Sequence, residues 1–302
     1  MKFKRAKIIV NPASNHGETK KVFGRVNDFF KGKLDFDLEL TEKPKQAIEM
    51  AKKLPDYDLV IAVGGDGTIF EIVNGLALSN NRETALGIIP TGSGNDLARI
   101  LGTPKDITRA CNEILNGHTK MIDLGLVNGV YYANSLGIGF DAQVAHTANK
   151  IKDEVKRSGL PLYLTALFKI LFKNYHPFKI SIKIEEEDFF TKKIVLIVAN
   201  NGISYGGGFK ITPKARNDDG LLNVCLIDEL PAWKVVPRLP FVIIGKHEWM
   251  KCAHTYRAKK IIVRAEEEVL PAQLDGELIT DNNFLIEIVP RALKVIVSKE
   301  DG

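Results

Sequence analysis

The sequence predicts an α/β protein of two domains, in which a doubly wound, mostly parallel α/β domain precedes an antiparallel β-sandwich. In the first 121 residues, short apolar runs alternate with amphipathic helical stretches, the order expected for a parallel sheet covered by helices. From residue 122 onward, strand-like runs separated by Gly, Asn, Asp or Pro predominate, as in a sandwich or, alternatively, a barrel. A chain of 302 residues is long enough for two such domains.

The N-terminal domain, residues 1–121, is predicted from alternating strands and helices. The apolar run 59–63 is short, β-branched and unalternated, which suits a strand buried on both faces. Residues 69–76 then repeat apolar side chains at helical spacing, and Pro44 is a favourable first residue for the preceding helix. The predicted strands are 7–10, 36–40, 59–63 and 85–90, and the predicted helices are 19–30, 44–54, 69–76, one from 97, and 107–116.

The C-terminal domain, residues 122–302, is predicted to be rich in strands. Asn128-Gly129 between two apolar runs is a strong hairpin signal. The sequence leaves open whether the last strand returns to the first domain. The predicted strands are 122–127, 130–136, 178–184, 190–199, 222–227, 259–264, 284–289 and 293–298, and the predicted helices are 142–156, 163–172 and 232–244.

Composition and charge limit the classes of function that fit the sequence. The net charge of +5 is mildly basic, and no stripe of Lys and Arg interleaved with aromatic residues occurs, which argues against a nucleic-acid partner. Three widely separated cysteines without a C-x-x-C pair, together with the absence of a signal-peptide pattern, predict a cytoplasmic protein. The longest apolar stretch, 160–172, is interrupted by Lys169 and is too short to span a bilayer.

The strongest functional signal is Gly64-Gly65-Asp66-Gly67-Thr68, at the junction of a predicted strand and a predicted helix. Ligands of open α/β sheets bind beyond the carboxyl ends of the strands. Glycines allow main-chain N–H groups to approach a phosphate, and the helix N-terminus favours its negative charge. Asp66 adds a carboxylate that suits a magnesium ion held on that phosphate.

A second glycine-rich loop, 91–96, follows the next strand and also carries an aspartate, Asp96. In a parallel sheet two such loops can lie side by side and form a metal–phosphate cleft. The alternative is that Asn95 or Asp96 caps the following helix. Two loops of one design favour the functional interpretation.

Further polar residues accompany these loops. Glu71 and Asn74 lie one turn beyond Asp66, and they are equally compatible with a solvated helix face and with a place in the site. Asn11-Pro12 with Ser14, and Thr41, follow the first two strands at the same edge of the sheet. They are candidates for contacts with a nucleotide, or they are ordinary helix entries. The candidates at the strand ends are Asn11, Pro12, Ser14 and Thr41.

Two acidic turns stand out in the C-terminal domain. Asp219, in a carboxylate-rich turn, suits either a cation site or a plain β-turn. Asp275-Gly276-Glu277 is either a hairpin turn or a general base that reaches into a cleft between the domains. Residues 137–142 imitate a dinucleotide-binding fingerprint, but no strand that ends in an acidic residue follows about 20 positions later, so a tight β-to-α turn is favoured.

Together these motifs resemble the bacterial diacylglycerol kinase-like lipid kinases, which are related to eukaryotic diacylglycerol and sphingosine kinases and more distantly to NAD kinases. The matching pieces occur in the order of the family over essentially the whole chain: Val10–Pro12, Gly64–Thr68, Pro90–Arg99, Gly137–Asp141, Tyr205–Gly208, Asp218–Leu221 and Leu274–Glu277. Gly-Gly-Asp-Gly-Thr alone is shared with NAD kinases, but in combination with the other pieces it is specific. This chain departs from the family at Ser93, where threonine is usual, and at Phe70, where a polar residue is common.

The resemblance implies an ATP- and Mg²⁺-dependent lipid kinase that transfers the γ-phosphoryl group of ATP to a lipid hydroxyl. Diacylglycerol giving phosphatidic acid, in phospholipid biosynthesis, is the favoured reaction. The alternatives are a kinase of another lipid or of NAD, and a catalytically silent regulator that binds a nucleotide or lipid. The complete acidic set, Asp66, Asp96, Asp275 and Glu277, argues against a silent protein.

The resemblance also assigns roles to residues. Asp66 and Asp96 organise the catalytic magnesium, and Asp275 and Glu277 form the catalytic acidic motif, with Asp275 favoured as the base. Asp219, with the carbonyl groups of Arg216 and Leu221, forms a structural magnesium site. The predicted nucleotide-binding residues are Asn11, Pro12, Ser14, Thr41, Gly64, Gly65, Asp66, Gly67, Thr68, Glu71, Ser93 and Asn95.

A lipid substrate implies contact with a membrane. The expected location is cytoplasmic, with peripheral contact at the inner face of the membrane. Residues 160–173 combine apolar bulk with Lys169 and Lys173, so they are predicted to form either an interfacial helix or a core helix of the second domain. A homodimer is one assembly that the sequence leaves open.

Overall fold

The computed structural model describes residues 3–17, 19–54, 56–79, 81–155, 159–173 and 175–298, without the side chains of residues 15, 16, 152 and 153. The chain divides into two compact units. Unit 1 comprises Met1–Asp123 and Arg291–Gly302, and unit 2 comprises Leu124–Pro290.

Unit 1 contains a parallel sheet. Its strands are ordered β2-β1-β3-β4, and the end of β15 adds to β4 in parallel, where Lys294 pairs with Ala85. Every residue of β3 and β4 is buried, as expected for parallel strands covered on both faces. The strands are β1 (Arg5–Val10), β2 (Asp35–Leu40), β3 (Leu59–Gly64) and β4 (Ala85–Pro90).

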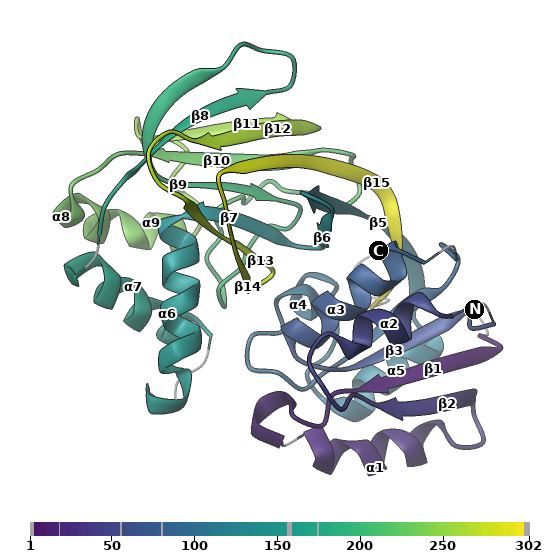
Figure 1. Cartoon of the computed structure of the whole chain (residues 1–302). Coiled ribbons are helices and arrows are strands. Elements are labelled where there is room, and N and C mark those ends of the chain that lie inside the picture. The colour runs from purple at the N-terminus through teal and green to yellow at the C-terminus, as the bar shows by residue number, and fades with distance from the viewer. Residues whose placement is uncertain are drawn as a thin grey trace. The chain divides into compact units, whose positions relative to one another are not determined.

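Helices cover both faces of this sheet, so the predicted doubly wound arrangement is confirmed. Val26, Phe30, Ala110 and Ile114, from α1 and α5, join one core cluster with the strands. Helices α2 and α3 pack on one another and lie on the other face (Figure 1). The helical elements are η1 (Ser14–Gly17), α1 (Thr19–Phe30), α2 (Gln46–Lys52), α3 (Asp66–Ala77), α4 (Asp96–Ile100) and α5 (Ile107–Asn116).

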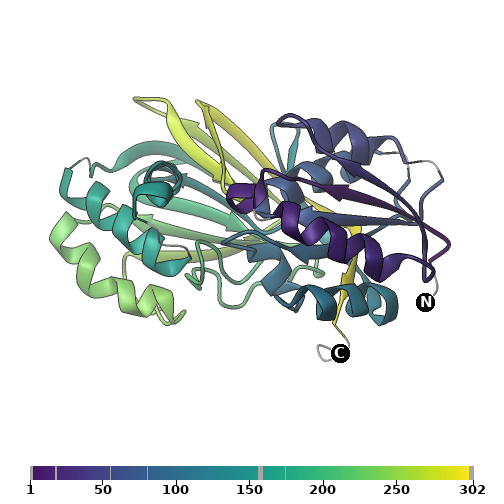
Figure 2. The same cartoon turned by 90° about the horizontal axis from the view of Figure 1, so that it is seen from below.

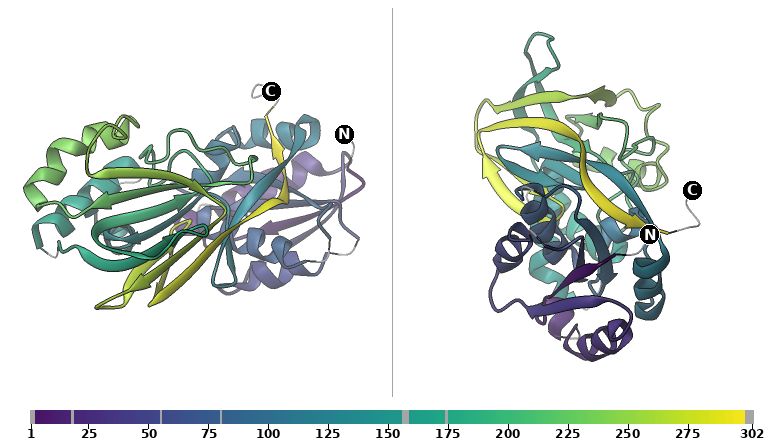
Figure 3. Two further views of the ribbon diagram at one scale, coloured as in Figure 1. Left: turned by 90° about the horizontal axis from the view of Figure 1, so that it is seen from above. Right: turned by 90° about the vertical axis from the view of Figure 1, so that its right-hand side faces the viewer.

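Unit 2 is built mainly from antiparallel strands, as predicted. They are ordered β14-β13-β7-β9-β8-β12-β15, while β10 pairs with β9 and β11, and β5 pairs with β6 and β15. The long strand β15 can be followed in yellow in Figure 3. The strands are β5 (His118–Val127), β6 (Val130–Tyr132), β7 (Ser135–Gly139), β8 (Phe178–Ile184), β9 (Phe190–Asn200), β10 (Leu222–Asp228), β11 (Ala253–Ala258), β12 (Lys260–Ala265), β13 (Leu270–Leu274), β14 (Glu277–Asp281) and β15 (Asn283–Val297).

The helices of unit 2 gather around one apolar cluster. Residues of α6 and α7 pack there with Leu239, and α7 lies beside the α8–α9 segment in both Figure 1 and Figure 2. Among the helices that the structure describes, none combines the length and apolar character that a bilayer crossing requires. The helical elements are α6 (Phe140–Val155), α7 (Leu160–Lys173), α8 (Ala232–Val235), η2 (Val236–Arg238) and α9 (Leu239–Ile243).

Several predicted boundaries in unit 2 are wrong. Residues 130–136 form two strands, β6 and β7, rather than one. The predicted helix 232–244 is divided into three short pieces, since Pro237 and Pro240 lack an N–H donor. The predicted strands 284–289 and 293–298 form the single strand β15, in which the N–H of Arg291 donates to Oδ1 of Asp123 at 2.8 Å.

Three strands, β11, β13 and β14, were not predicted. Strands β11 and β14 each pair with one neighbour only, so the alternation of apolar residues that marks a covered strand is weak in them. Pro271 lies inside β13, and because proline is uncommon in strands, the sequence did not predict a strand there.

Two helical glycines give a matched test of the packing in unit 1. A Cβ atom on Gly75 of α3 would lie 2.4 Å from the carbonyl oxygen of Ile48 in α2, whereas one on Gly24 of α1 would meet nothing within 4 Å. We expect Gly75→Ala to lower the free energy of unfolding by about 1–3 kcal/mol through overpacking. Gly24→Ala should raise it by about 0.5–1 kcal/mol through helix propensity. Urea denaturation measures both, and equal effects would contradict the close packing of α2 on α3.

Candidate functional site

The glycine turn after β3 touches the glycine loop after β4. A Cβ atom on Gly92 would lie 2.6 Å from the Cα of Gly65, and one on Gly94 would lie 2.5 Å from Oδ2 of Asp66. A side chain at Gly92 would therefore push the two loops apart, and one at Gly94 would displace the carboxylate. The structure thus brings together the two loops that the sequence placed at one edge of the sheet.

Asp66 joins the two loops through both oxygens of its carboxylate. Oδ2 accepts a hydrogen bond from the N–H of Asn95 at 2.8 Å, and Oδ1 accepts one from the N–H of Asp96 at 2.7 Å. Burial, and next the negative charge of Asp96, raise the pKa of Asp66 above its ordinary value, while the two amide donors oppose this shift. Such a pair of carboxylates fits a divalent cation, because each oxygen keeps a lone pair beside its N–H partner.

Arg99 is a further member of this cluster that the sequence analysis did not assign. Its Nη1 donates to Oδ1 of Asp96 at 2.7 Å, and its Nη2 donates to the carbonyl oxygen of Gly94 at 2.6 Å. The guanidinium therefore supports the second loop and brings a positive charge to it. Spacing within α4 was the available signal, since Asp96 and Arg99 are three residues apart on one helix face.

Asn95 closes its own loop instead of capping the helix. It occupies the N-cap position of α4 without a capping bond from its side chain, and its φ of 52° is left-handed, which asparagine tolerates. Its Nδ2 donates to the carbonyl oxygen of Gly92 at 2.7 Å, and its Oδ1 accepts from the N–H of Gly92 at 3.1 Å. The capping alternative is therefore wrong for Asn95.

The other predicted nucleotide contacts lie in and around the first turn. Nδ2 of Asn11 donates to Oγ1 of Thr68 at 2.9 Å, which fixes the end of β1 against the start of α3. A Cβ atom on Gly65 would lie 3.2 Å from Oγ of Ser14. The N–H of Thr41 donates to the carbonyl oxygen of Val10 at 2.9 Å. Pro12 lies in the turn before η1, Gly67 lies in the first turn of α3, and Ser93 is exposed in the second loop.

Glu71 and Asn74 have structural partners. The carboxylate of Glu71 accepts from the N–H groups of Lys45 at 2.9 Å and Ala47 at 3.1 Å, so it supports the start of α2. Nδ2 of Asn74 donates to the carbonyl oxygen of Phe70 at 3.0 Å, and the side chain is buried. The alternative of a solvated helix face is therefore wrong for Asn74.

The Asp275-Gly276 pair forms the tight hairpin between β13 and β14, with φ values of 48° and 94°. The carboxylate of Asp275 accepts three main-chain N–H groups, from Ala133 at 2.7 Å, Asn134 at 3.1 Å and Ser135 at 2.8 Å. Asp275 therefore holds the connection between β6 and β7. Glu277, at the start of β14, is exposed.

The predicted structural magnesium site around Asp219 contains a competing cation. Oδ1 of Asp219 accepts from the N–H of Leu221 at 3.1 Å, and Oδ2 accepts from Nη2 of Arg257 at 2.5 Å. Nε of Arg216 lies 3.3 Å from Oδ1 of Asp218. A guanidinium thus pairs with one oxygen of the Asp219 carboxylate, as Arg99 pairs with one oxygen of Asp96, and the structural magnesium site stays a prediction. Within the described ranges, no cluster of three or more His, Cys, Asp and Glu side chains is placed to hold a metal ion.

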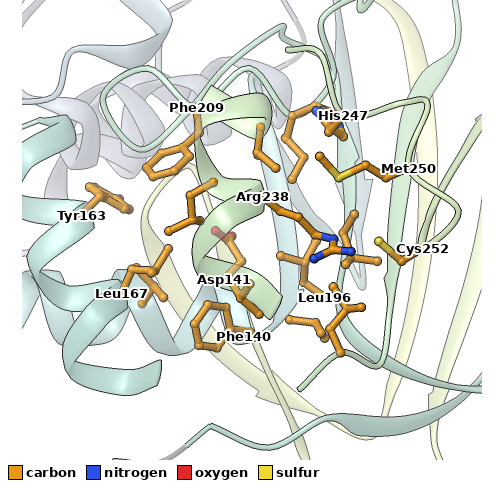
Figure 4. A pocket seen from close by; sticks show the side chains of 18 of the residues that line it. Phe140, Asp141, Tyr163, Leu167, Leu196, Phe209, Arg238, His247, Met250 and Cys252 are labelled. Carbon is orange, nitrogen blue, oxygen red and sulfur yellow. Dashed lines mark hydrogen bonds between the residues drawn. The ribbon is translucent and has the colours of Figure 1, made fainter. Parts of the chain in front are cut away.

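Unit 2 contains an apolar pocket, in which the space free of protein atoms, open solvent included, amounts to about 810 Å³. Tyr163 and Leu167 line one side, and Met250 and Cys252 line the opposite side (Figure 4). Hydrocarbon side chains from α6, α7, β9, α9 and the segment after it form most of the wall. Such a pocket suits an apolar or amphipathic ligand.

One carboxylate, Asp141, lies in this apolar wall. It is 8% exposed, and its Oδ2 accepts from Nε2 of Gln273 at 3.0 Å. Burial raises the pKa of Asp141 to about 6, against the lowering effect of hydrogen bonds from Tyr205 and Gln273. The sequence predicts a tight turn at residues 137–142 and a family motif at Gly137–Asp141, but it does not predict the burial of Asp141, which arises from distant segments.

Comparison with known proteins agrees with this architecture. Residues 5–127 match the diacylglycerol kinase catalytic domain, and residues 134–297 match the YegS C-terminal NAD kinase beta sandwich-like domain. A diacylglycerol kinase of Bacillus subtilis is 32% identical over 279 residues, which cover 91% of this chain and 90% of that protein. The crystal structure of a candidate diacylglycerol kinase from Bacillus anthracis superposes with a TM-score of 0.84 at 26% identity, covering 99% of this chain and 97% of that one.

An NAD kinase from Archaeoglobus fulgidus, solved in complex with ATP, has a TM-score of 0.55 at 15% identity, covering 98% of this chain and 94% of that one. This likeness shows the fold alone. The predicted fold class, a parallel α/β domain followed by a β-sandwich, is confirmed.

The buried carboxylate of Asp141 makes a testable contribution to the pH dependence of stability. Because its pKa is about 6 in the folded protein and 3.8 ordinarily, the folded state binds more protons between these values. The free energy of unfolding should therefore fall by roughly 3 kcal/mol as the pH rises from about 3 to 7, and Asp141→Asn should remove this fall. Urea denaturation at several pH values measures it, with the exposed Asp188→Asn as the control. Identical pH profiles for wild type and Asp141→Asn would contradict the assignment.

Proposed function

The chain belongs to the diacylglycerol kinase-like lipid kinases, and from this we propose that it transfers the γ-phosphoryl group of ATP to the free hydroxyl of a diacylglycerol, giving phosphatidic acid. The observation that carries the choice of acceptor is the pocket of unit 2, whose wall is almost wholly hydrocarbon. Acyl chains bury apolar surface there, whereas a soluble dinucleotide would leave its polar groups without partners.

The donor nucleotide binds at the two touching glycine loops of unit 1. Their main-chain amides and the N-terminus of α3 favour the negative charge of phosphate groups. Asp66 and Asp96 would hold the magnesium ion, whose charge offsets that of the phosphates. Arg99 stabilises the second loop, so that the two loops keep one geometry during transfer.

Glu277 is the better candidate for the general base than Asp275. A base needs an oxygen that can take up the proton of the acceptor hydroxyl. Three main-chain amides occupy the carboxylate of Asp275, which makes it a positioning residue for the hairpin. The exposed carboxylate of Glu277, two residues later, is accessible to a substrate hydroxyl.

A panel of acceptors tests the reaction. With radiolabelled ATP and Mg²⁺, we expect label in diacylglycerol and little in sphingosine, phosphatidylglycerol or NAD assayed side by side. Asp66→Ala should reduce the transfer by at least ~100-fold, since the cluster that organises the donor loses its central carboxylate. Label in NAD alone, or in none of the four acceptors, would contradict the proposal.

The roles of Glu277 and Asp275 can be distinguished by the stability of their variants. Glu277→Gln should reduce kcat by roughly 10²–10⁴-fold and leave the unfolding midpoint unchanged. Asp275→Asn should also lower the free energy of unfolding by about 1–3 kcal/mol, because a buried N–H donor loses its acceptor. Kinase assays and thermal denaturation measure the two effects, with Glu266→Gln as the control. Full activity of Glu277→Gln would rule it out as the base.

A further inference from the structure

The segment from 231 to 252, here called the mouth segment, forms part of the wall of the pocket in unit 2. Val235, Leu239 and Val242 of its short helices, and Met250 after them, line the pocket (Figure 4). His247 is fully buried, with its Nε2 3.0 Å from the carbonyl oxygen of Ile211, so the segment is anchored to the rest of the unit. One side of the mouth segment is therefore committed to the pocket.

Large apolar side chains of the same segment remain exposed. Trp233 is 71% exposed, Trp249 is 70% exposed and Ile244 is 54% exposed. Phe241 contacts the ring of Trp249 at a centroid distance of 5.7 Å and is itself 39% exposed. These two tryptophans are the only ones in the chain, although tryptophan is on average a highly buried residue.

The charge of the mouth segment is strongly positive. Its basic residues are Lys234, Arg238, Lys246 and Lys251, and its one acidic residue, Glu248, pairs with Lys214 at 2.5 Å. Nζ of Lys234 lies 5.1 Å from the ring centroid of Trp233, so charge and aromatic surface are presented together. Tryptophan beside lysine is the composition of protein surfaces that enter the interface of an anionic membrane.

Helix α7 lies beside the mouth segment (Figure 2), and its side chains are similar in kind. Phe172 is 77% exposed and stacks on Phe168 at a centroid distance of 6.3 Å, while Lys169 and Lys173 are exposed next to them. Leu162, Ala166, Leu167 and Leu171 of the same helix are buried in the core. The predicted core helix at residues 160–173 is therefore confirmed, and the interfacial alternative stays a prediction for its exposed face.

We propose that the mouth segment docks on the surface of an anionic lipid bilayer, with Trp233 and Trp249 entering the interfacial region and Lys234, Lys246 and Lys251 facing acidic headgroups. The positive charge favours an anionic surface. The exposed aromatic residues are stabilised by apolar contact with the bilayer, which a soluble polar partner would not provide. The pocket lies directly behind this surface, so a lipid can pass between bilayer and pocket without crossing much water. This last point rests on the proposed lipid substrate, whereas the docking itself does not.

Intrinsic fluorescence tests the docking directly, because both tryptophans lie on the proposed surface. Vesicles of phosphatidylcholine mixed with phosphatidylglycerol should shift the emission of the full chain to shorter wavelength, and brominated phospholipid should quench it. Trp233→Phe and Trp249→Phe each leave one reporter, and both reporters should respond. Vesicles of pure phosphatidylcholine should bind far more weakly.

Charge variants show whether binding to vesicles depends on the position of the lysines in the chain. Lys234→Gln combined with Lys246→Gln should weaken binding to the anionic vesicles roughly 30-fold, since each basic residue near such a surface contributes a factor of about five. Lys31→Gln combined with Lys105→Gln removes the same charge from exposed positions of unit 1 and should change binding little. Phe189→Ala, which truncates an exposed aromatic residue elsewhere in unit 2, should also have no effect.

The outcomes separate docking from catalysis. The charge and tryptophan variants should phosphorylate short-chain diacylglycerol dispersed in detergent at the wild-type rate and lose activity on vesicles. An unchanged tryptophan spectrum with anionic vesicles, or equal weakening by the two lysine pairs, would overturn the docking surface. So would a dimer that dissociates on Trp233→Ala with Trp249→Ala while vesicle binding persists. Vesicle binding without kinase activity in the wild type would instead contradict the proposed reaction.

Discussion

The hydrogen bonds of the Asp66 carboxylate hold together the part of the molecule that suits a phosphate. Two neighbouring parallel strands bring their carboxyl ends to the same level, with Gly64 paired to Pro90 and the N–H of Thr91 donating to the carbonyl oxygen of Gly64 at 2.9 Å. Glycines then let the two loops approach so closely that a Cβ atom on Gly92 would lie 2.6 Å from the Cα of Gly65. Because Asp66 accepts from two amides of the second loop, the strain of a left-handed Asn95 is tolerated.

Local patterns in the sequence were enough to predict unit 1 as far as α5, but not the addition of the end of β15 to its sheet. Buried β-branched runs, glycine turns and helical spacing reflect contacts within a few residues of each other or along one edge of a sheet. The structural role of Glu71 could not be predicted from local patterns, because the N–H groups that it accepts from, those of Lys45 and Ala47, lie at the start of another helix. A carboxylate one turn beyond a glycine loop looks the same in sequence whether it meets a ligand or supports a neighbouring helix.

Unit 2 was harder to predict, since its chemistry depends on long-range contacts. The three amides that occupy Asp275 belong to residues about 140 positions earlier, so the spacing of Asp275 and Glu277 alone could not separate their roles. The same holds for Asp141, whose partner Gln273 lies 132 residues away. Edge strands such as β14 add to the difficulty, because exposed faces impose no apolar alternation.

The pocket and the exposed tryptophans both bear on how a lipid would reach the protein from a bilayer. The free energy of an acyl chain falls when the chain leaves water. An acyl chain therefore does not readily pass through water from bilayer to pocket. The mouth segment meets this constraint by having one side in the pocket wall and another side rich in tryptophan and lysine. The buried carboxylate of the pocket, Asp141 with its partners Tyr205 and Gln273, lies on elements other than the mouth segment. Under the proposed docking, the segment can therefore adjust to the bilayer while these polar residues keep their positions.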